Sequence, residues 1–217
     1  MSLWDKLLDL FFPPRCAFCG RVEETGLCKA CEKSLPRREK MLCEYSFARV
    51  AAPLFYMGTV REAVLKLKFS GGLGRLKGFS RLMAECAAEE FSGEFDCVSF
   101  VPVSTKRRRG RGYDQAERLA IELGRYWDTK PLRFLKKRHH TKAQSTIKDP
   151  AARHANVFGV YEAVNLERIR GARILLVDDV VTTGATLKEC VRVLKEAGAA
   201  DVLGLTLAAA EEKSARG

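Results

Sequence analysis

Two adjacent carboxylates, Asp178 and Asp179, follow four apolar residues in the stretch ILLVDDVVTTGATL, residues 174–187. Neighbouring side chains of a strand point to opposite faces, and burying an ionised carboxylate is costly. Both acids could therefore stay ionised only at the end of the strand, where water reaches them. The next turn offers hydroxyls, a permissive glycine and the first amides of a helix, which together bind phosphate readily. Its candidate ligands are Thr182, Thr183, Gly184, Ala185 and Thr186. Because carboxylates bind hydroxyls or a hydrated magnesium ion, the stretch predicts a sugar phosphate site.

An apolar strand that ends in two acids also resembles the magnesium-binding strand of P-loop ATPases. That interpretation requires a phosphate-binding loop of the form GxxxxGK[ST] elsewhere in the chain. The sequence contains no such loop. The acids therefore favour a sugar phosphate over a nucleotide bound in the manner of those ATPases.

Four of the eight cysteines form two CxxC pairs. Each pair can place two thiolates on one metal ion from a tight turn, so two pairs supply a closed tetrahedral set of sulfurs. The four candidate ligands are Cys16, Cys19, Cys28 and Cys31. Nothing in the sequence directs secretion and hence disulfide formation, so we expect zinc, with iron as the alternative. The metal should be structural, because no coordination position would stay open.

The other cysteines have simpler interpretations. Cys86 and Cys190 lie on apolar faces at helical spacing, and Cys97 begins an apolar strand, so we expect all three in the core. Cys43 is either a separate fifth thiol or the remnant of a second metal-binding knuckle.

The chain is strongly basic, with 38 lysines and arginines against 27 acids and a formal net charge of +11. Part of this charge is concentrated in two short runs, at residues 106–111 and 136–142. Such clusters point to polyanionic ligands such as phosphates or nucleic acid. The alternative is a charge that serves only solubility.

The elements that must position these residues alternate along the chain from about Arg49 onward. Five segments have the composition of strands, at residues 97–103, 132–136, 157–161, 173–179 and 202–208. A helix is expected after Asp114, which can cap it, and another from about Ala185 to Ala197, ending at Gly198. This alternation predicts a parallel sheet covered on both faces, with ligands bound beyond the carboxyl ends of its strands.

The length of 217 residues suits one main core and a small satellite domain. Near the N-terminus, Leu3, Leu7, Leu10 and Phe11 recur at helical spacing. They predict a short amphipathic helix that docks on the rest of the protein, or alternatively on a membrane or a partner. No apolar run approaches the ~20 residues of a membrane-spanning helix, so we expect no membrane span and a cytoplasmic location.

Residues 174–187 resemble the phosphoribosyl pyrophosphate signature of type I phosphoribosyltransferases. Nearly the whole chain resembles one branch, the ComF competence-protein family, in which a zinc-binding N-terminus precedes a phosphoribosyltransferase domain. The matching segments are 7–20, 65–72, 101–120, 140–144, 152–161 and 174–187. The resemblance implies an α/β fold with a parallel-sheet type I phosphoribosyltransferase domain flanked by helices at residues 49–217. The N-terminal helix and the four-cysteine zinc-binding segment would occupy residues 1–48. Many relatives carry further CxxC pairs, whereas only Cys43 follows here.

The resemblance also implies roles for individual residues. Asp178 and Asp179 would hold the ribose hydroxyls and act in catalysis, while residues 182–186 would hold the 5'-phosphate. Segment 136–156 would form a mobile hood over the anomeric carbon. The pyrophosphate, bound with magnesium, would be held by Val103, Ser104, Thr105, Lys106, Arg138, Lys142 and Arg153. His139, His140 and His154 also lie on the hood, and we interpret them as solvated, with pyrophosphate binding by the adjacent pair His139 and His140 as the alternative.

Three functions remain open at this point. The resemblance implies a phosphoribosyl pyrophosphate-binding protein that serves uptake or processing of single-stranded DNA in competence, with partners such as a helicase. The second is an active enzyme that moves ribose 5-phosphate to a nitrogen acceptor. The third is a regulator gated by phosphoribosyl pyrophosphate without turnover. The sequence identifies neither an acceptor nor the oligomeric state.

Overall fold

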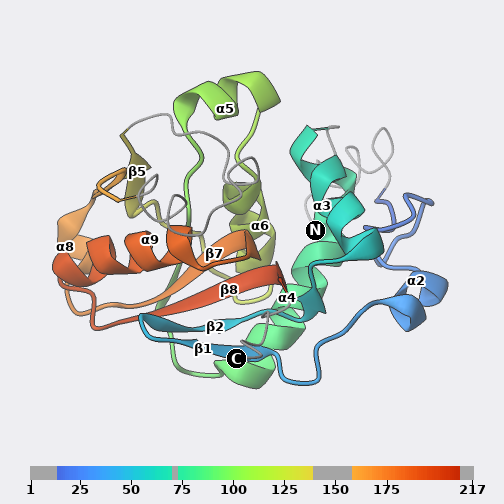
Figure 1. Cartoon of the computed structure of the whole chain (residues 1–217), viewed down its shortest axis with the longest axis horizontal. Helices are drawn as coiled ribbons and strands as arrows, with labels where there is room; N and C mark the ends of the chain where they lie inside the picture. Colours follow the sequence, from blue (N-terminus) through green and yellow to red (C-terminus); the bar gives the residue numbers. More distant parts are fainter. Residues whose placement is uncertain (1–13, 70–72, 139–157, 211–217) are drawn as a thin grey trace, which may run out of the picture.

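The computed structural model describes residues 14–69, 73–138 and 158–210 (Figure 1). Its centre is a six-stranded sheet with strand order β1-β2-β8-β7-β4, in which β3 also pairs with β8. The strands are β1 (Leu42–Tyr45), β2 (Ala48–Ala51), β3 (Leu54–Phe55), β4 (Cys97–Phe100), β7 (Arg173–Val181) and β8 (Asp201–Ala209). All pairs are parallel except β1 with β2, which form an antiparallel hairpin at the edge. The predicted parallel sheet is therefore confirmed.

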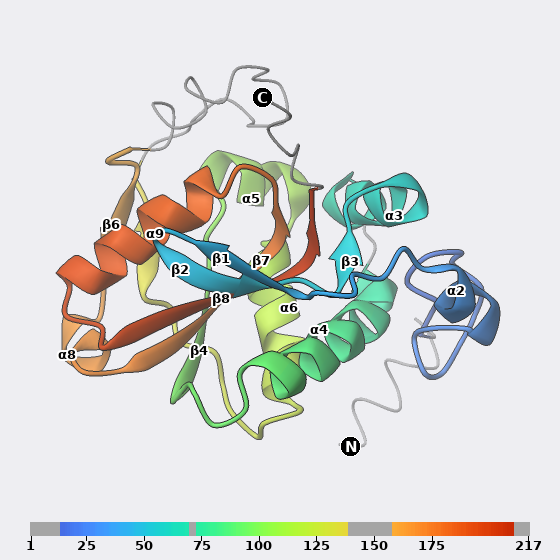
Figure 2. The same cartoon turned by 60° about the horizontal axis from the view of Figure 1, so that its bottom comes forward.

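Helices cover both faces of this sheet (Figure 2). On one face, side chains of α3 (Gly58–Phe69), α4 (Leu76–Glu90) and α6 (Gln115–Gly124) pack in one apolar cluster with Leu175 and Val177 of β7. On the other face, α9 (Ala185–Glu196) packs on Ile174 and Leu176. Alternate residues of β7 thus enter opposite cores, which explains its continuous apolar run.

The remaining described helices are short. They are α2 (Lys29–Ser34), η1 (Leu73–Arg75), α5 (Thr105–Arg111) and α8 (Leu166–Ile169). None of the helices in the described ranges has the length and apolar content that a membrane crossing requires. The predicted N-terminal amphipathic helix lies outside these ranges.

Several local expectations are confirmed. Asp114 caps α6 by accepting a hydrogen bond from the Glu117 amide, and α9 ends just before Gly198, whose φ of +97° suits only glycine. Cys86 and Cys190 are buried in the core at 1% and 0% exposure. Cys43 is buried on β1, where it accepts a hydrogen bond from Arg38.

Other boundaries differ from the prediction. β4 ends at Phe100 rather than residue 103, because Pro102 has no amide to continue the ladder. β7 continues two residues past Asp179, pairing Val180 and Val181 with β8. The segments expected as strands at 132–136 and 157–161 appear as β5 (Leu135–Lys137) and β6 (Tyr161–Ala163).

The expectation that β5 and β6 join the main sheet is wrong. They form a separate two-stranded antiparallel sheet, with Leu135 opposite Ala163 and Lys137 opposite Tyr161. Flanking backbone hydrogen bonds extend this pairing, because the Arg138 amide donates to the Val160 carbonyl at 2.8 Å and the Val164 amide to the Phe134 carbonyl at 2.9 Å. The two strands flank segment 139–157, which lies outside the described residues.

The cysteine-containing N-terminal segment packs directly on α4. Arg75 donates hydrogen bonds to the carbonyls of Ala17 and Phe18 at 2.7 and 3.0 Å. The rings of Phe18 and Phe79 meet edge to face, with their centroids 5.6 Å apart. These contacts join the metal-binding segment and the main core in one apolar cluster.

Candidate functional site

The turn between β7 and α9 is built around Gly184. Its φ of +72° is left-handed, and a Cβ there would lie 3.0 Å from the Phe47 ring and 3.3 Å from the Tyr45 ring. These two rings stack on each other with centroids 5.0 Å apart. The β1–β2 hairpin therefore forms an aromatic wall against this turn, and glycine is required both for the backbone angle and for space.

The predicted phosphate ligands surround the start of α9. Thr182 is exposed, Thr186 is half-buried, and Ala185 begins the helix. The hydroxyl of Thr183 is buried and has no hydrogen-bond partner in the described part of the chain. Leaving a buried hydroxyl unsatisfied costs about 1–3 kcal/mol, which a phosphate oxygen beside the helix amides would offset.

The two carboxylates lie before this turn on β7. The Asp179 amide donates to Asp178 Oδ1 at 2.8 Å, and Asp179 Oδ2 lies 2.9 Å from Lys68 Nζ. Burial, together with the neighbouring Asp179 charge, raises the pKa of Asp178 to about 8. Asp178 is therefore a weaker acid than a carboxyl group at the water-exposed end of a strand would be.

Lys68 is the site residue that sequence reasoning missed. It lies in the last turn of α3, far from Asp179 in the sequence. Burial alone would lower the pKa of its ammonium, but the carboxylates of Asp179 and Asp178 outweigh that effect and raise it. The only available signal was its place in the segment LKLKFSGG, which carries no indication of a partner.

The predicted pyrophosphate loop follows β4, the strand next to β7. The Val103 amide donates to Asp114 Oδ2 at 2.8 Å, Ser104 is buried, and Thr105 begins α5. Both loops thus leave the carboxyl ends of neighbouring parallel strands, where ligands of such sheets bind. The described structure brings residues 103–105 to the same sheet edge as the acid pair.

The other predicted pyrophosphate ligands are not brought to this site by the described residues. Arg138 is exposed at the end of β5 and forms an ion pair with Glu162 at 2.8 Å. The Lys106 side chain, Lys142 and Arg153 lie outside the described structure, as do the three histidines. Their roles stay predictions.

The acid pair does not fit a magnesium ion held by the protein alone. Magnesium needs carboxylate oxygens that are free to coordinate it. Here Asp179 is already engaged by a cation, and one oxygen of Asp178 accepts a backbone amide. Oxygens in this arrangement suit sugar hydroxyls better, because hydroxyls need acceptors but bring no charge.

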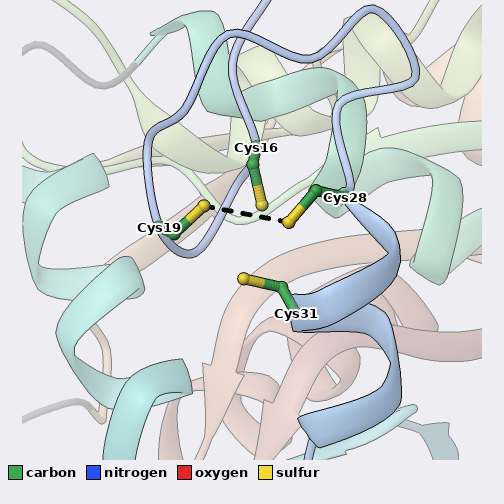
Figure 3. Close-up of side chains that lie close together, drawn as sticks. All are labelled: Cys16, Cys19, Cys28 and Cys31. Atoms are coloured by element: carbon green, nitrogen blue, oxygen red, sulfur yellow. Dashed lines mark hydrogen bonds between the residues drawn. The ribbon is translucent and has the colours of Figure 1, made fainter.

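The four predicted metal ligands converge from the turn at Cys16 and Cys19 and from the start of α2 at Cys28 and Cys31 (Figure 3). Their Sγ atoms all lie within 4.8 Å of one another, and those of Cys19 and Cys28 are 3.9 Å apart. Tetrahedral zinc with Zn–S distances of ~2.3 Å requires sulfurs ~3.8 Å apart, so the cluster fits zinc. Burial opposes ionisation, yet amide hydrogen bonds from Cys28 and Cys19 lower the pKa of Cys16 to about 6. A thiolate is the form that binds metal.

Comparison with known proteins agrees with both parts of this architecture. Residues 76–216 match the model of the phosphoribosyl transferase domain. The chain belongs to the phosphoribosyl transferase domain family. Residues 7–54 match the double zinc ribbon domain, which together with the cysteine cluster supports structural zinc.

The relatives are competence and DNA-utilization proteins. The chain is 25% identical to competence protein ComFC of Streptococcus pneumoniae, over 94% of this chain and 84% of that protein. It is 36% identical to competence protein F of Haemophilus influenzae, over 47% of this chain and 45% of that protein. It is 28% identical to the DNA utilization protein YhgH of Escherichia coli K12, over 86% of each. The chain is thus a competence-related, phosphoribosyltransferase-like protein.

Among solved structures, the chain is similar to a glutamine phosphoribosylpyrophosphate amidotransferase from B. subtilis. The TM-score is 0.43 with 22% identity, over 64% of this chain and 30% of that one.

Proposed function

We propose that the protein binds phosphoribosyl pyrophosphate at the edge where β4 and β7 end, and that this site serves uptake or processing of single-stranded DNA. The observation that carries the proposed ligand binding is the acid pair followed by the turn at the start of α9. In this turn the Thr183 hydroxyl is buried and has no hydrogen-bond partner among the described residues. The names of the relatives support the second part. Because four zinc-binding thiolates must stay reduced, the proposal places the protein in the cytoplasm.

The geometry suggests how the ligand would lie. The 5'-phosphate would accept hydrogen bonds from the first amides of α9 and from the hydroxyl of Thr183. The ribose hydroxyls would donate to Asp178 and Asp179, which lie five and four residues before Thr183 on β7. The pyrophosphate would then extend toward the loop at 103–105, which the buried Asp114 holds in place.

Isothermal titration calorimetry tests ligand binding directly. The wild-type protein should bind phosphoribosyl pyrophosphate in magnesium buffer, and an Asp178→Ala, Asp179→Ala double variant should bind it at least about tenfold more weakly. Asp96→Ala is the matched control, because Asp96 contacts Arg173 at the opposite end of β7. Equal affinity of the double variant and the wild type would refute the assignment.

The second part of the proposal rests on exposed basic residues near the same edge. α5 lies above the ends of the strands in Figure 1, and Arg108 and Arg109 on it are exposed. Such residues bind nucleic acid phosphates with a strong dependence on salt. Single-stranded DNA binding should fall steeply with rising salt, and Arg109→Ala should weaken it more than Arg168→Ala on α8. A DNA affinity that does not change with salt would exclude binding through these charges.

Turnover requires a separate assay. Pyrophosphate release is measured with a panel of nucleobase and amine acceptors, using the double acid variant as the blank. Release with one acceptor class establishes a transferase. If no acceptor produces pyrophosphate release above the blank although the ligand binds, the result would favour a protein that binds phosphoribosyl pyrophosphate without transferring its ribose 5-phosphate.

A further inference from the structure

Lys68 and Asp179 form an ion pair inside the candidate site. Their charged atoms are 2.9 Å apart, and their side chains are only 23% and 13% exposed. Water therefore screens this pair much less than the surface pairs of the protein, such as Arg138 with Glu162 at 53% and 38% exposure. The positive charge of Lys68 interacts electrostatically with both carboxylates of the acid pair.

The end of α3 that carries Lys68 is fixed in position. The Tyr113 hydroxyl donates a hydrogen bond to the carbonyl of Leu67, and both residues are buried. Tyr113 is followed directly by Asp114, which caps α6 and holds the Val103 amide. Hence one junction positions both the ammonium beside the acid pair and the loop expected to bind pyrophosphate.

This cation comes from a part of the chain that precedes the range matched to the domain family. α3 ends at Phe69, whereas the match to the phosphoribosyl transferase domain begins at residue 76. The lysine therefore lies in the segment between the cysteine cluster and the matched range. Its effect is to cancel one negative charge of the acid pair.

The charge of the site decides which ligands it accepts. A divalent cation needs uncompensated negative charge and free carboxylate oxygens, whereas a sugar hydroxyl needs only an acceptor. We propose that Lys68 is a specificity-determining residue, a built-in counter-ion that prevents the acid pair from binding free divalent cations and orients Asp179 toward sugar hydroxyls. The sugar in this statement rests on the proposed function, but the exclusion of cations does not.

Manganese binding to the full-length, zinc-loaded protein tests the exclusion without any sugar phosphate. Mn²⁺ prefers the same oxygen ligands as Mg²⁺, and electron paramagnetic resonance measures the free ion directly. Lys68→Met removes the charge and should raise Mn²⁺ affinity at least about tenfold over wild type. Lys66→Met is the matched control on the exposed side of the same helix, and it should leave affinity unchanged.

A third variant assigns any new manganese site to the acid pair. Asp179→Asn in the Lys68→Met background should return Mn²⁺ affinity to the wild-type level. Lys68→Gln, which can still donate a hydrogen bond to Asp179, provides the same test if the methionine variant does not fold. A folded Lys68 variant that binds Mn²⁺ no better than wild type overturns the proposal.

The outcome is distinguishable from that of the proposed function. If wild-type protein fails to bind phosphoribosyl pyrophosphate in calorimetry, the proposed function fails whatever the manganese result. If it binds the sugar phosphate but Lys68→Met gains no manganese site, only the role of Lys68 fails. Orientation of Asp179 has its own readout, because Lys68→Arg should retain sugar phosphate affinity better than Lys68→Met.

Discussion

The Thr183 hydroxyl and the Asp178 carboxyl are shielded from water at the candidate site in ways that reduce the stability of the fold. The Thr183 hydroxyl has no hydrogen-bond partner among the described residues, and burial raises the pKa of Asp178 to about 8. Side chains selected for folding alone would avoid both conditions. Substitutions at these residues should therefore weaken ligand binding without lowering the free energy of unfolding.

Thr183→Val should weaken phosphoribosyl pyrophosphate binding by about ten- to hundredfold, because it removes a hydrogen bond to a charged phosphate. The free energy of unfolding should stay unchanged or rise by about 1 kcal/mol, since a buried unsatisfied hydroxyl is lost. Calorimetry and urea denaturation measure the two effects. Ser99→Ala is the control, because it removes another buried hydroxyl, within β4, that has no hydrogen-bond partner in the described ranges. It should leave binding unchanged, and a loss of stability in Thr183→Val would contradict the interpretation.

Asp178→Asn should become more stable relative to wild type as the pH rises from about 4 to 8. In this window the folded wild type retains a proton on Asp178 that the unfolded chain has released, so wild-type stability falls with rising pH. The difference should grow by about 1 kcal/mol per pH unit, measured by urea denaturation at several pH values.

Asp96→Asn serves as the control for this pH series. The Arg173 guanidinium lowers the pKa of the exposed Asp96, so that pair stabilises the fold above the ordinary aspartate range and loses its effect in acid. The Asp96 variant should therefore differ from wild type at neutral pH and converge with it in acid. A stability difference for Asp178→Asn that does not change with pH would contradict a raised pKa.

Among the secondary-structure elements, those determined by local sequence were predictable and those determined by distant partners were not. The Asp114 cap and the end of α9 at Gly198 depend on a few neighbouring residues, so the sequence indicates both. The pairing of β5 with β6 depends on two segments separated by more than twenty residues. Lys68 meets Asp179 only after α3 has packed against the sheet, and no helical or strand periodicity encodes that contact.

The packing of α4 on the metal-binding segment gives a further prediction. A Cβ on Gly78 would lie 2.0 Å from the Gly26 carbonyl oxygen, so Gly78→Ala must push the two segments apart. It should lower the free energy of unfolding by about 2 kcal/mol. Gly110→Ala on α5 is the control, because a Cβ there contacts nothing within 4 Å. That variant should be neutral or slightly stabilising in urea denaturation, and equal effects of the two variants would contradict the close contact.

At the scale of the whole molecule, the zinc-binding segment and the main domain share one apolar cluster. A small metal-binding segment cannot build a sufficient core alone, so its folding depends on the metal and on this shared surface. Loss of the metal should therefore destabilise the main domain as well as the cysteine-containing segment. The contacts of Arg75 with Ala17 and Phe18 give a direct route for that effect.

Elemental analysis should find one zinc ion per chain, because the described residues contain one four-cysteine cluster. Cys31→Ser should lower zinc content and reduce the melting temperature of the whole protein, while Cys97→Ser, outside the cluster, should retain zinc. Two zinc ions per chain, iron in place of zinc, or a melting temperature that does not respond to zinc loss would each contradict this account.

The β1–β2 hairpin limits how the protein can be divided. β1 precedes residue 48, yet it pairs with β2, and Tyr45 at the end of β1 and Phe47 in the turn lie against Gly184. A shortened protein that begins at residue 49 would lose these two rings, and β2, still paired with β8, would become an exposed edge strand that can associate with other chains. Shortened proteins made for crystallisation or for mixing domains between relatives should therefore begin before Leu42, so that the hairpin stays with the domain whose ligand turn it supports.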